Sequence, residues 1–380
     1  MKRRVLIIMG TRPETIKMAP VIWALAQDQR YEPLVLSTGQ HGELLAPLFN
    51  LFAITPTVTL AAMREGQSLP ELTARLLQGI TPIIQELTPA VTLVHGDTAT
   101  CLAGALGSFY ARVPIVHVEA GLRTGCLTAP FPEEMNRRLT SGLAGLHLAP
   151  TVRAADNLRR EGVAARTIEV TGNTVVDALI WTLNHTSRPK EPPWASVVAR
   201  FPRLILLTAH RRENQGPVMS TAIRAVCRVA SGFSDAAVVI PVHPNPCVQT
   251  AVAEAVQEEP RAFLVPPLPY EAFVHLMQAC AIIVTDSGGI QEEAPTLGRP
   301  TLVLRTETER MEAVEAGQAI LVGLNPESIT STLHHLLADE AAYCALATPA
   351  QIFGDGAAAP RVVAALDRHW SQLCSQSGNS

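Results

Sequence analysis

Lysine, aromatic residues and long apolar stretches are all scarce in this sequence. Of the 380 residues, 4% are aromatic and 17% are charged, and Lys2, Lys17 and Lys190 are the only lysines among 30 basic residues. No stretch approaches the roughly 18 apolar residues that a membrane-spanning helix needs. A net charge of −4 provides no general attraction to nucleic acid or to an anionic membrane. With 47% hydrophobic residues, the composition predicts a folded protein rather than a disordered chain, with neither nucleic acid nor membrane as partner.

The 7 cysteines are scattered, odd in number and never arranged as a CxxC pair. This usage is typical of reduced thiols in a cytoplasmic protein. The basic N-terminus is followed by a short apolar run, residues 5–9, which ends at Gly10 and is too short for the apolar region of a secretion signal. We interpret residues 5–9 as the first buried strand and predict a cytoplasmic location.

Short apolar runs alternate with helical segments, such as 69–87 and 99–112, along the whole chain. Near-continuous apolar strands separated by helices predict parallel sheets that are covered on both faces. A polar, proline-rich segment at 186–193 interrupts the alternation and fits a linker or an edge loop. The expected strands are 5–9, 33–37, 91–95, 114–118 and 167–170 before this segment, and 204–208, 237–242, 262–265, 282–285, 301–304 and 319–322 after it.

This pattern, together with the chain length, predicts two doubly wound α/β domains with a ligand cleft between them. Doubly wound sheets bind ligands beyond the carboxyl ends of their strands. Functional residues are therefore expected directly after the strands.

Three acidic residues of the first half occupy such positions. Asp97 follows the strand at 91–95, and Glu119 follows the strand at 114–118. Neighbouring parallel strands lie about 4.8 Å apart, so both carboxylates can face one crevice. Glu133 comes after a stiff, proline-rich approach and is expected to begin a helix. Acids gathered in one crevice shift each other's pKa values and provide acid/base pairs.

A structural role explains the same positions equally well. Asp97 can cap the next helix, and the helix dipole alone favours Glu133 at a helix start. His95 and His117 each lie two residues before an acid, which is compatible with a metal site. Such histidines are more often hydrogen-bonded core residues, so we expect no metal.

A basic turn at 10–17 links the first strand to the first helix. It is neither a GxGxxG nor a Walker sequence and carries no dinucleotide or nucleoside-triphosphate fingerprint. Arg12 and Lys17 either neutralise a phosphate at the helix start or are solvated surface charges.

The most informative segment of the second half follows the strand at 282–285. Ser287, Gly288 and Gly289 open a helix and leave backbone N–H groups available to an anion. Glu293 lies one turn further on, where a carboxylate can accept hydrogen bonds from ribose hydroxyl groups.

Two histidine loops and a further cation complete the candidates. His210 lies beside two arginines, which indicates a diphosphate-binding or acid site or simply a basic surface turn. His243 follows the next strand without an evident partner, and Arg310 follows another strand as one more cation.

These segments together resemble the non-hydrolysing UDP-N-acetylglucosamine 2-epimerases. The matching motifs run in family order from residue 10 to residue 310. They are GTRPETIK at 10–17, TGQH at 38–41, HGDT at 95–98, HVEAGLRTG at 117–125, PFPEEMNRRLT at 130–140, TGNTVVDAL at 171–179, HRREN at 210–214, HPN at 243–245, TDSGGIQEEAPTLGRP at 285–300 and TER at 308–310.

The resemblance implies the GT-B architecture, in which two Rossmann-like domains enclose a cleft. The expected domains are 1–172, with the catalytic carboxylates, and 173–360, with the UDP site. A C-terminal helix and polar tail at 361–380 are expected to pack back on the first domain. The resemblance also implies UDP-GlcNAc and UDP-ManNAc as ligands and a homodimer as the assembly.

Site residues follow from the same resemblance. It implies acid/base roles for Asp97, Glu119 and Glu133, and places His210 with them, in contact with the sugar nucleotide. The implied substrate-binding residues are Arg12, Lys17, Phe273, Ser287, Gly288, Gly289, Glu293 and Arg310, with Phe273 near the uracil. The implied reaction eliminates UDP to leave 2-acetamidoglucal and adds UDP back after protonation of the opposite face, with neither a metal nor a redox cofactor.

The chain departs from the family pattern at a few positions. Gly42 stands where the family often has an arginine near a regulatory UDP-GlcNAc site, and Cys126 stands where it often has an acid.

Other functions share parts of this pattern. A hydrolysing epimerase that releases free ManNAc and UDP shares much of the site, and a GT-B glycosyltransferase shares the fold. A sugar-nucleotide sensor needs the glycine turn but not three acids, and a metal-dependent hydrolase needs the histidine–acid pairs.

Overall fold

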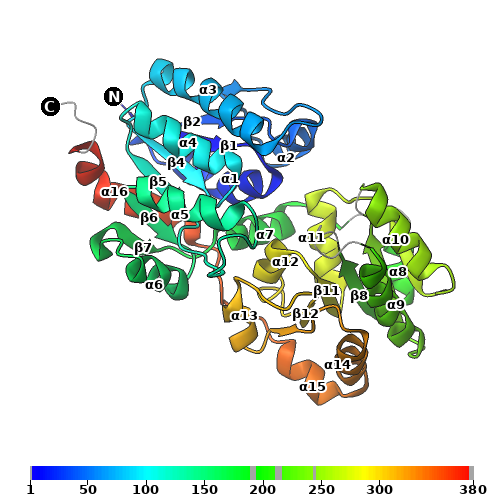
Figure 1. Ribbon diagram of the computed structural model, residues 1–380. Coiled ribbons are helices and arrows are strands. Elements are labelled where there is room, and N and C mark those ends of the chain that lie inside the picture. Colours follow the sequence, from blue (N-terminus) through cyan, green and yellow to red (C-terminus); the bar gives the residue numbers. More distant parts are fainter. Residues whose placement is uncertain (1, 189–193, 210–215, 243–244, 376–380) are drawn as a thin grey trace. The chain divides into compact units, whose positions relative to one another are not determined.

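The computed structural model describes residues 2–188, 194–209, 216–242 and 245–375 (Figure 1). The chain divides into an N-terminal unit, Met1–Ala178 with Phe353–Ser380, and a C-terminal unit, Leu179–Ile352. The predicted boundary after residue 360 differs from this division, because helix α16 (Ala358–Ser375) lies wholly in the N-terminal unit. Helix α7 (Thr174–His185) begins in the N-terminal unit and ends in the C-terminal unit.

In the described part of the chain, the N-terminal unit holds a seven-stranded sheet in the order β3-β2-β1-β4-β5-β6-β7, with all pairs parallel. Helices α3, α4 and α5 pack against one another, and α1 packs against α16. Because right-handed crossovers run in opposite directions from β1 and from β4, these two sets of helices cover opposite faces. The strands are β1 (Arg3–Met9), β2 (Tyr31–Ser37), β3 (Val58–Thr59), β4 (Val91–His95), β5 (Ile115–Val118), β6 (Leu146–Ala149) and β7 (Ile168–Val170), and the helices are α1 (Arg12–Gln27), α2 (Ala46–Leu51), α3 (Leu69–Leu87), α4 (Ala99–Tyr110), α5 (Glu133–Leu143) and α6 (Val152–Arg160).

Local sequence accounts for these helices. Thr11 and Glu14 form a reciprocal capping box at the start of α1, and Ser68 and Glu71 form another at the start of α3. Along α3, apolar residues recur at helical spacing, and this stripe packs on the buried side chains of β1.

The C-terminal unit repeats the doubly wound plan. Its described residues form a six-stranded parallel sheet in the order β10-β9-β8-β11-β12-β13. Its strands are β8 (Arg203–Thr208), β9 (Ala236–Pro241), β10 (Ala262–Val265), β11 (Ile282–Thr285), β12 (Thr301–Val303) and β13 (Ala319–Leu321), and its helices are α8 (Trp194–Arg200), α9 (Pro217–Ser231), α10 (Pro246–Val256), α11 (Tyr270–Ala279), α12 (Gly288–Glu293), α13 (Met311–Glu315), α14 (Pro326–Ala338) and α15 (Glu340–Leu346).

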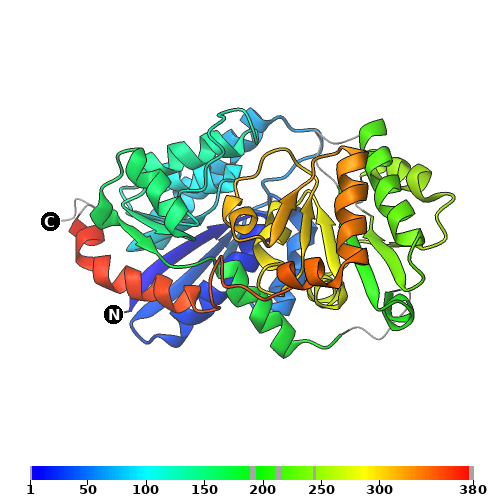
Figure 2. The ribbon, with the colours of Figure 1, turned by 90° about the horizontal axis from the view of Figure 1, so that it is seen from below.

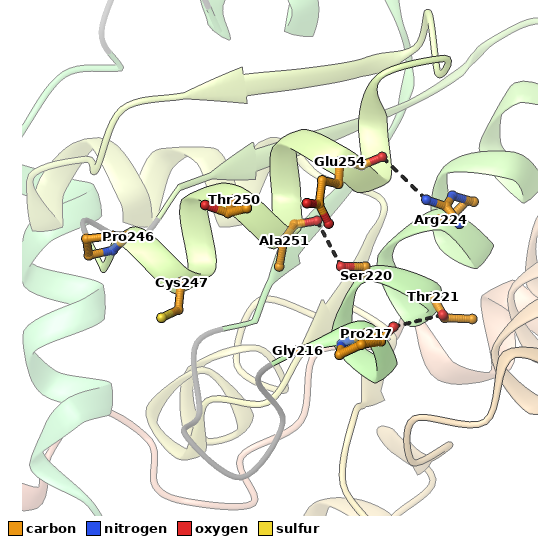
Figure 3. Close-up of a pocket in the computed structure, with 10 residues that line it drawn as sticks. All are labelled: Gly216, Pro217, Ser220, Thr221, Arg224, Pro246, Cys247, Thr250, Ala251 and Glu254. Atoms are coloured by element: carbon orange, nitrogen blue, oxygen red, sulfur yellow. Dashed lines mark hydrogen bonds between the residues drawn. The ribbon is translucent and has the colours of Figure 1, made fainter.

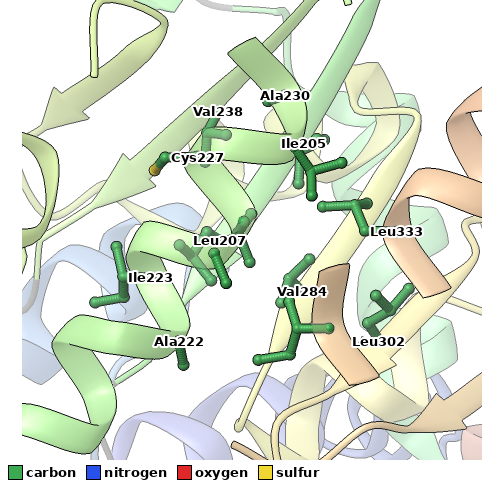
Figure 4. Close-up of a cluster of buried hydrophobic side chains, with 14 of the residues drawn as sticks. Ile205, Leu207, Ala222, Ile223, Cys227, Ala230, Val238, Val284, Leu302 and Leu333 are labelled. Atoms are coloured by element: carbon green, nitrogen blue, oxygen red, sulfur yellow. The ribbon is translucent and has the colours of Figure 1, made fainter. Parts of the chain in front are cut away.

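Apolar side chains of this second sheet form a core with the helices on one face. Ile205 and Leu207 of β8 and Val284 of β11 are fully buried beneath Ile223 of α9 and Leu333 of α14 (Figure 4). Removing one such side chain typically destabilises a protein by about 2–5 kcal/mol. The core therefore fixes the strand ends that carry the candidate residues of this unit.

The expected strands are confirmed, with ends that shift by no more than two residues. Two short strands, β3 and β6, were not predicted, because two and four residues are too few for a periodic signal. Within the described residues, none of the helices is long and apolar enough to cross a membrane. The C-terminal helix α16, red in Figure 2, runs along the N-terminal unit, where Asp367 pairs with Arg3 and Arg30.

Candidate active site

The candidate residues of the N-terminal unit lie where the strand order reverses. β1 pairs with both β2 and β4, so the chain winds away from this point in both directions. β4 and β5 pair in a register that places His95 opposite Val118, so Asp97 and Glu119 leave neighbouring strand ends. Arg12 and Lys17 follow β1 on helix α1. The structure thus gathers these four residues at one edge of one sheet.

Glu119 is the centre of a buried, charged cluster. Its carboxylate forms an ion pair with Lys17, and Oε2 also accepts a hydrogen bond of 3.0 Å from Nδ2 of Asn173. Nε2 of His95 lies 3.8 Å from the same oxygen. Glu119 has φ +62°, a left-handed conformation that costs a non-glycine residue about 1–3 kcal/mol and is most often found at functional sites.

Asp97 belongs to a second charged group that helix α5 supplies. Nε and Nη2 of Arg137 lie 2.9 and 2.7 Å from Oδ2 of Asp97, and Asn136 donates to the Asp97 carbonyl at 2.8 Å. Nη1 of Arg137 pairs with the fully buried Glu134 at 3.0 Å. The cap of α4 is Thr98 rather than Asp97, so the capping explanation for Asp97 does not hold.

Glu133 begins α5, as expected from the sequence. Glu134, which the sequence-based reasoning passed over, is the fully buried acid of the pair, and its carboxylate also accepts from the Thr124 backbone at 3.1 Å. Glu134 and Arg137 lie three residues apart on α5, a spacing at which helical side chains meet, so their pairing could have been inferred from the sequence.

Of the two strand histidines, His95 faces Glu119, whereas His117 behaves as a hydrogen-bonded core residue. Nε2 of His117 lies 2.7 Å from the Gly96 carbonyl, and burial lowers the pKa of His117 to about 3, so its imidazole is neutral. Among the described residues, no group of three or more His, Cys, Asp and Glu side chains has an arrangement that could hold a metal ion.

Glu14 is a buried acid that supports the loops of the candidate site and that the sequence analysis missed. Its Oε2 accepts from the backbone N–H groups of Gly10 and Thr11 at 2.8 Å, and Oε1 accepts from Thr98 at 2.5 Å. Burial raises the pKa of Glu14 to about 7, although the donated hydrogen bonds oppose the shift. The carboxylate therefore joins the loop after β1 to the loop after β4. The capping-box spacing from Thr11 to Glu14 was a signal that could have identified it.

Arg12 starts helix α1 and is half-buried. Its backbone N–H donates to Nδ1 of His41 at 3.2 Å, and burial lowers the pKa of its guanidinium. The basic turn at 10–17 is therefore part of the folded site rather than a solvated surface loop.

The candidate residues of the C-terminal unit form a separate group after β11. Ser287 precedes α12, and a Cβ atom added to Gly288 would lie 3.0 Å from Cζ of Arg310. Arg310 is held there by Glu292, 2.8 Å from its Nη2, and by Glu309. The guanidinium thus lies directly beside the glycine turn. A turn with exposed backbone N–H groups next to a cation is suited to bind an anion.

Glu293 ends α12, and Phe273 lies on the preceding helix, α11. Oε1 of Glu293 accepts from the buried Tyr270 hydroxyl at 2.8 Å, and burial together with this carboxylate raises the pKa of Tyr270. Phe273 is half-buried on α11, one turn beyond Tyr270. His210 and His243 lie outside the described residues.

A cavity of about 550 Å³ lies elsewhere in this unit, between α9 and α10 (Figure 3). It is lined by hydroxyl and charged side chains, including Ser220, Arg224 and Glu254, and the Ser220 hydroxyl donates to the Ala251 carbonyl at 3.2 Å. None of the residues that line it is a predicted site residue.

Two doubly wound parallel-sheet units, with charged residues after the central strands of one and a glycine turn after a central strand of the other, define a two-domain α/β protein of the GT-B class. Comparison with known proteins refines this class. The family described as UDP-N-acetylglucosamine 2-epimerase matches residues 23–367.

Individual relatives agree with the family match. The chain is 45% identical to the UDP-N-acetylglucosamine 2-epimerase of Yersinia pestis, over 96% of this chain and 99% of that protein, and 45% identical to that of Escherichia coli K12, over 96% and 98%. A crystal structure of UDP-GlcNAc 2-epimerase from Neisseria meningitidis bound to UDP-GlcNAc is similar with a TM-score of 0.89 and 40% identity, over 96% of this chain and all of that one. The chain belongs to the UDP-N-acetylglucosamine 2-epimerase family.

Proposed function

We propose that this chain converts UDP-GlcNAc into UDP-ManNAc by inverting C2, without releasing free sugar and without a metal or redox cofactor. The observation that carries the proposal is the pair of charged groups on neighbouring strand ends, Glu119 with Lys17 and Asp97 with Arg137. The relative bound to UDP-GlcNAc supports the choice of substrate.

The chemistry explains why such a site is needed. No carbonyl acidifies the C2–H bond of the sugar, so a carboxylate alone faces a large pKa gap. Elimination avoids this gap: the C1–O bond to UDP breaks, C2 loses its proton, and 2-acetamidoglucal remains. UDP then adds back to C1 while C2 receives a proton on the opposite face. The overall reaction is neither an oxidation nor a reduction, so it requires no electron acceptor.

The residues divide between proton transfer and stabilisation of charge. Carboxylates positioned on both faces of the sugar transfer the protons, and cations stabilise the departing diphosphate. The proposed proton-transfer group is Asp97, Glu119, Glu133 and His210. The proposed substrate contacts are Arg12, Lys17, Phe273, Ser287, Gly288, Gly289, Glu293 and Arg310.

Incubation with UDP-GlcNAc in D2O, followed by NMR, tests this function. We expect UDP-ManNAc that carries deuterium at C2, and UDP-GlcNAc that acquires deuterium by the reverse reaction. Free ManNAc with UDP as the only products would instead identify a hydrolysing epimerase. Sugar transfer to an added acceptor without epimer would identify a glycosyltransferase, and absence of any turnover would refute the enzymatic proposal.

We also propose a homodimer in the cytoplasm. Phe131, Met135 and Leu139 recur at helical spacing at the start of α5 and along it, and are 70%, 38% and 49% exposed, which is unusual for large apolar side chains. All seven cysteines are free, which fits a reducing compartment. Sedimentation of the wild-type chain and of Leu139→Glu tests the assembly: we expect a dimer and a monomer, respectively.

A further inference from the structure

The motif TGNTVVDAL at 171–179 has no role in the function proposed above. It leads from β7 into α7, the helix on which the chain leaves the N-terminal unit. Asn173, which immediately precedes α7, is 2% exposed. Its side chain is therefore placed by contacts with the protein rather than by solvent.

The orientation of the Asn173 amide is determined by its neighbours. Oδ1 accepts from the backbone N–H of Val175 at 3.1 Å, and a backbone N–H can only donate. Nδ2 must then face the other way, where it donates to Oε2 of Glu119 at 3.0 Å. The amide thus presents a fixed donor to the proposed acid/base residue.

Asn173 also contacts the segment on which the chain returns from the C-terminal unit to the N-terminal unit. Its backbone N–H donates to the carbonyl of Phe353, the first residue back in the N-terminal unit, at 2.6 Å. One turn along α7, the Asp177 carboxylate accepts from the backbone N–H groups of Ala358 and Ala359 at 3.1 and 2.8 Å. The outgoing and returning segments are therefore joined at two neighbouring points, of which only Asn173 contacts Glu119.

We propose that Asn173 is a positioning residue for the epimerisation: it fixes the Glu119 carboxylate for proton transfer and anchors it to the outgoing and returning segments. This inference rests on the proposed role of Glu119. Lys17 and Asn173 both donate to Oε2, so together they fix the rotation of the carboxylate and the direction in which Oε1 points. Donors that contact a carboxylate also favour its ionised form.

In the contacts that the structure describes, charged and polar groups reach Glu119 from three elements, and the buried Cys101 of α4 interacts with it electrostatically. Lys17 approaches from α1, His95 from β4, and Asn173 from the residue before α7. Asp97 follows the adjacent strand β4. Because Asn173 is uncharged, it can fix the geometry without altering the net charge of this cluster.

Two substitutions of Asn173 separate its role as a donor to Glu119 from its role as an acceptor at the first turn of α7. In Asn173→Ser the hydroxyl oxygen can still accept from the first turn of α7, but the donor to Glu119 is lost. Asn173→Asp keeps the shape and the cap and places a second carboxylate against Oε2. We expect kcat to fall about 10-fold in the serine variant and about 100-fold in the aspartate variant, because a hydrogen bond to a charged group is lost and, in the latter, repulsion is added. KM should change less than about twofold, since the role proposed for Asn173 is to act through Glu119 rather than on the substrate.

The pH profile of kcat distinguishes positioning from a merely structural role. Losing a donor, or gaining a neighbouring negative charge, favours the protonated form of Glu119. The limb of the profile that reports Glu119 should therefore move to higher pH in both variants, and further in Asn173→Asp than in Asn173→Ser. A structural defect would lower the melting temperature without moving this limb.

Asp177→Asn is the matched control, since it weakens the second tie and leaves Glu119 untouched. We expect it to lower the melting temperature and to keep the wild-type kcat and pH profile. Glu119→Gln separates this inference from the proposed function: wild-type turnover in that variant would overturn the role of Glu119 itself. The role of Asn173 would be overturned by a different result: Glu119→Gln is inactive, but Asn173→Ser and Asn173→Asp both keep the wild-type kcat and pH profile.

Discussion

The two units present their candidate residues at equivalent places in equivalent sheets, yet they use different chemical groups. In the N-terminal unit the groups after the central strands are carboxylates paired with cations, the buried Glu119 with Lys17 and the partly buried Asp97 with Arg137. In the C-terminal unit they are the backbone of a glycine turn with Arg310 behind it. Carboxylates can gain and lose protons, whereas backbone amides and a guanidinium cannot. Changes at Asp97 and Glu119 should therefore act on turnover, and changes at the glycine turn on ligand affinity.

The largest effect is expected for Asp97→Asn. The amide retains the shape and can still accept a hydrogen bond from Arg137, but it cannot transfer a proton. We expect kcat to fall by about 10²–10⁴-fold while the affinity for UDP, measured by calorimetry, is unchanged. Glu161→Gln, a change of the same kind at a half-exposed acid that pairs with Arg123, should keep the wild-type kcat. Equal losses in kcat and in UDP affinity for Asp97→Asn would contradict the division between the carboxylates and the glycine turn.

Burial also makes the stability of the N-terminal unit depend on pH at Glu14. Its pKa in the folded chain is about 7, above the ordinary value of 4.5, so between these values the folded chain binds a proton that the unfolded chain has released. The favourable contribution is complete below pH 4.5 and is lost as the pH rises through 7. Glu14→Gln mimics the protonated form. We expect the free energy of unfolding of wild type to fall by about 2–3 kcal/mol more than that of Glu14→Gln between pH 5 and pH 8.

Glu71 provides the matched control for this pH effect. It occupies the same position of the same capping motif at the start of α3, but there the motif is exposed, and hydrogen bonds from Ser68 lower the pKa of Glu71. Its contribution is lost as the pH falls, so Glu71→Gln should change the pH dependence in the opposite sense. A change of the same sign in both variants would show that the motif, rather than burial, sets the pKa of Glu14.

The sequence predicted every described strand except β3 and β6, the adjacency of Asp97 and Glu119, and the helix start at Glu133. These follow from local apolar patterns and from the rule that parallel strands end at one edge. The pairing of Lys17 with Glu119 joins residues 102 positions apart, and no local pattern encodes it. The same holds for Arg137 with Asp97 and for Asn173 with Glu119. Such side-chain partners depend on the depth to which each loop is buried, which only the packed structure defines.

Lys17→Arg tests whether the side-chain pairs of the N-terminal unit need a particular cation. The Lys17 side chain is 6% exposed, and a planar guanidinium in place of the compact ammonium must displace neighbours or turn Glu119. We expect kcat to fall by about 10- to 100-fold with an unchanged charge. Lys2→Arg, at an exposed position of the same unit, is the control. A fully active Lys17→Arg would mean that charge alone suffices. The presence of one of the chain's three lysines at this site would then have no functional basis.

The smallest effect is expected in the C-terminal unit, for Gly288→Ala. The added Cβ would lie 3.0 Å from Cζ and from Nη1 of Arg310. The guanidinium cannot move aside freely, because the buried carboxylates of Glu292 and Glu309 hold it. The turn must therefore shift by a few tenths of an ångström, which displaces the N–H groups that we propose bind the diphosphate. We expect UDP to bind about 10-fold more weakly, which corresponds to about 1.4 kcal/mol, with kcat at saturation changed by less than about twofold.

A glycine in open space distinguishes this steric effect from the general effect of alanine in a helix. Gly142 lies in α5, and a Cβ added there has no neighbour within 4 Å. Gly142→Ala should raise the free energy of unfolding by up to about 1 kcal/mol and leave UDP affinity unchanged. If Gly288→Ala lowers kcat instead of affinity, the glycine turn participates in the reaction step, and the contrast between catalytic carboxylates and a binding turn fails at this residue.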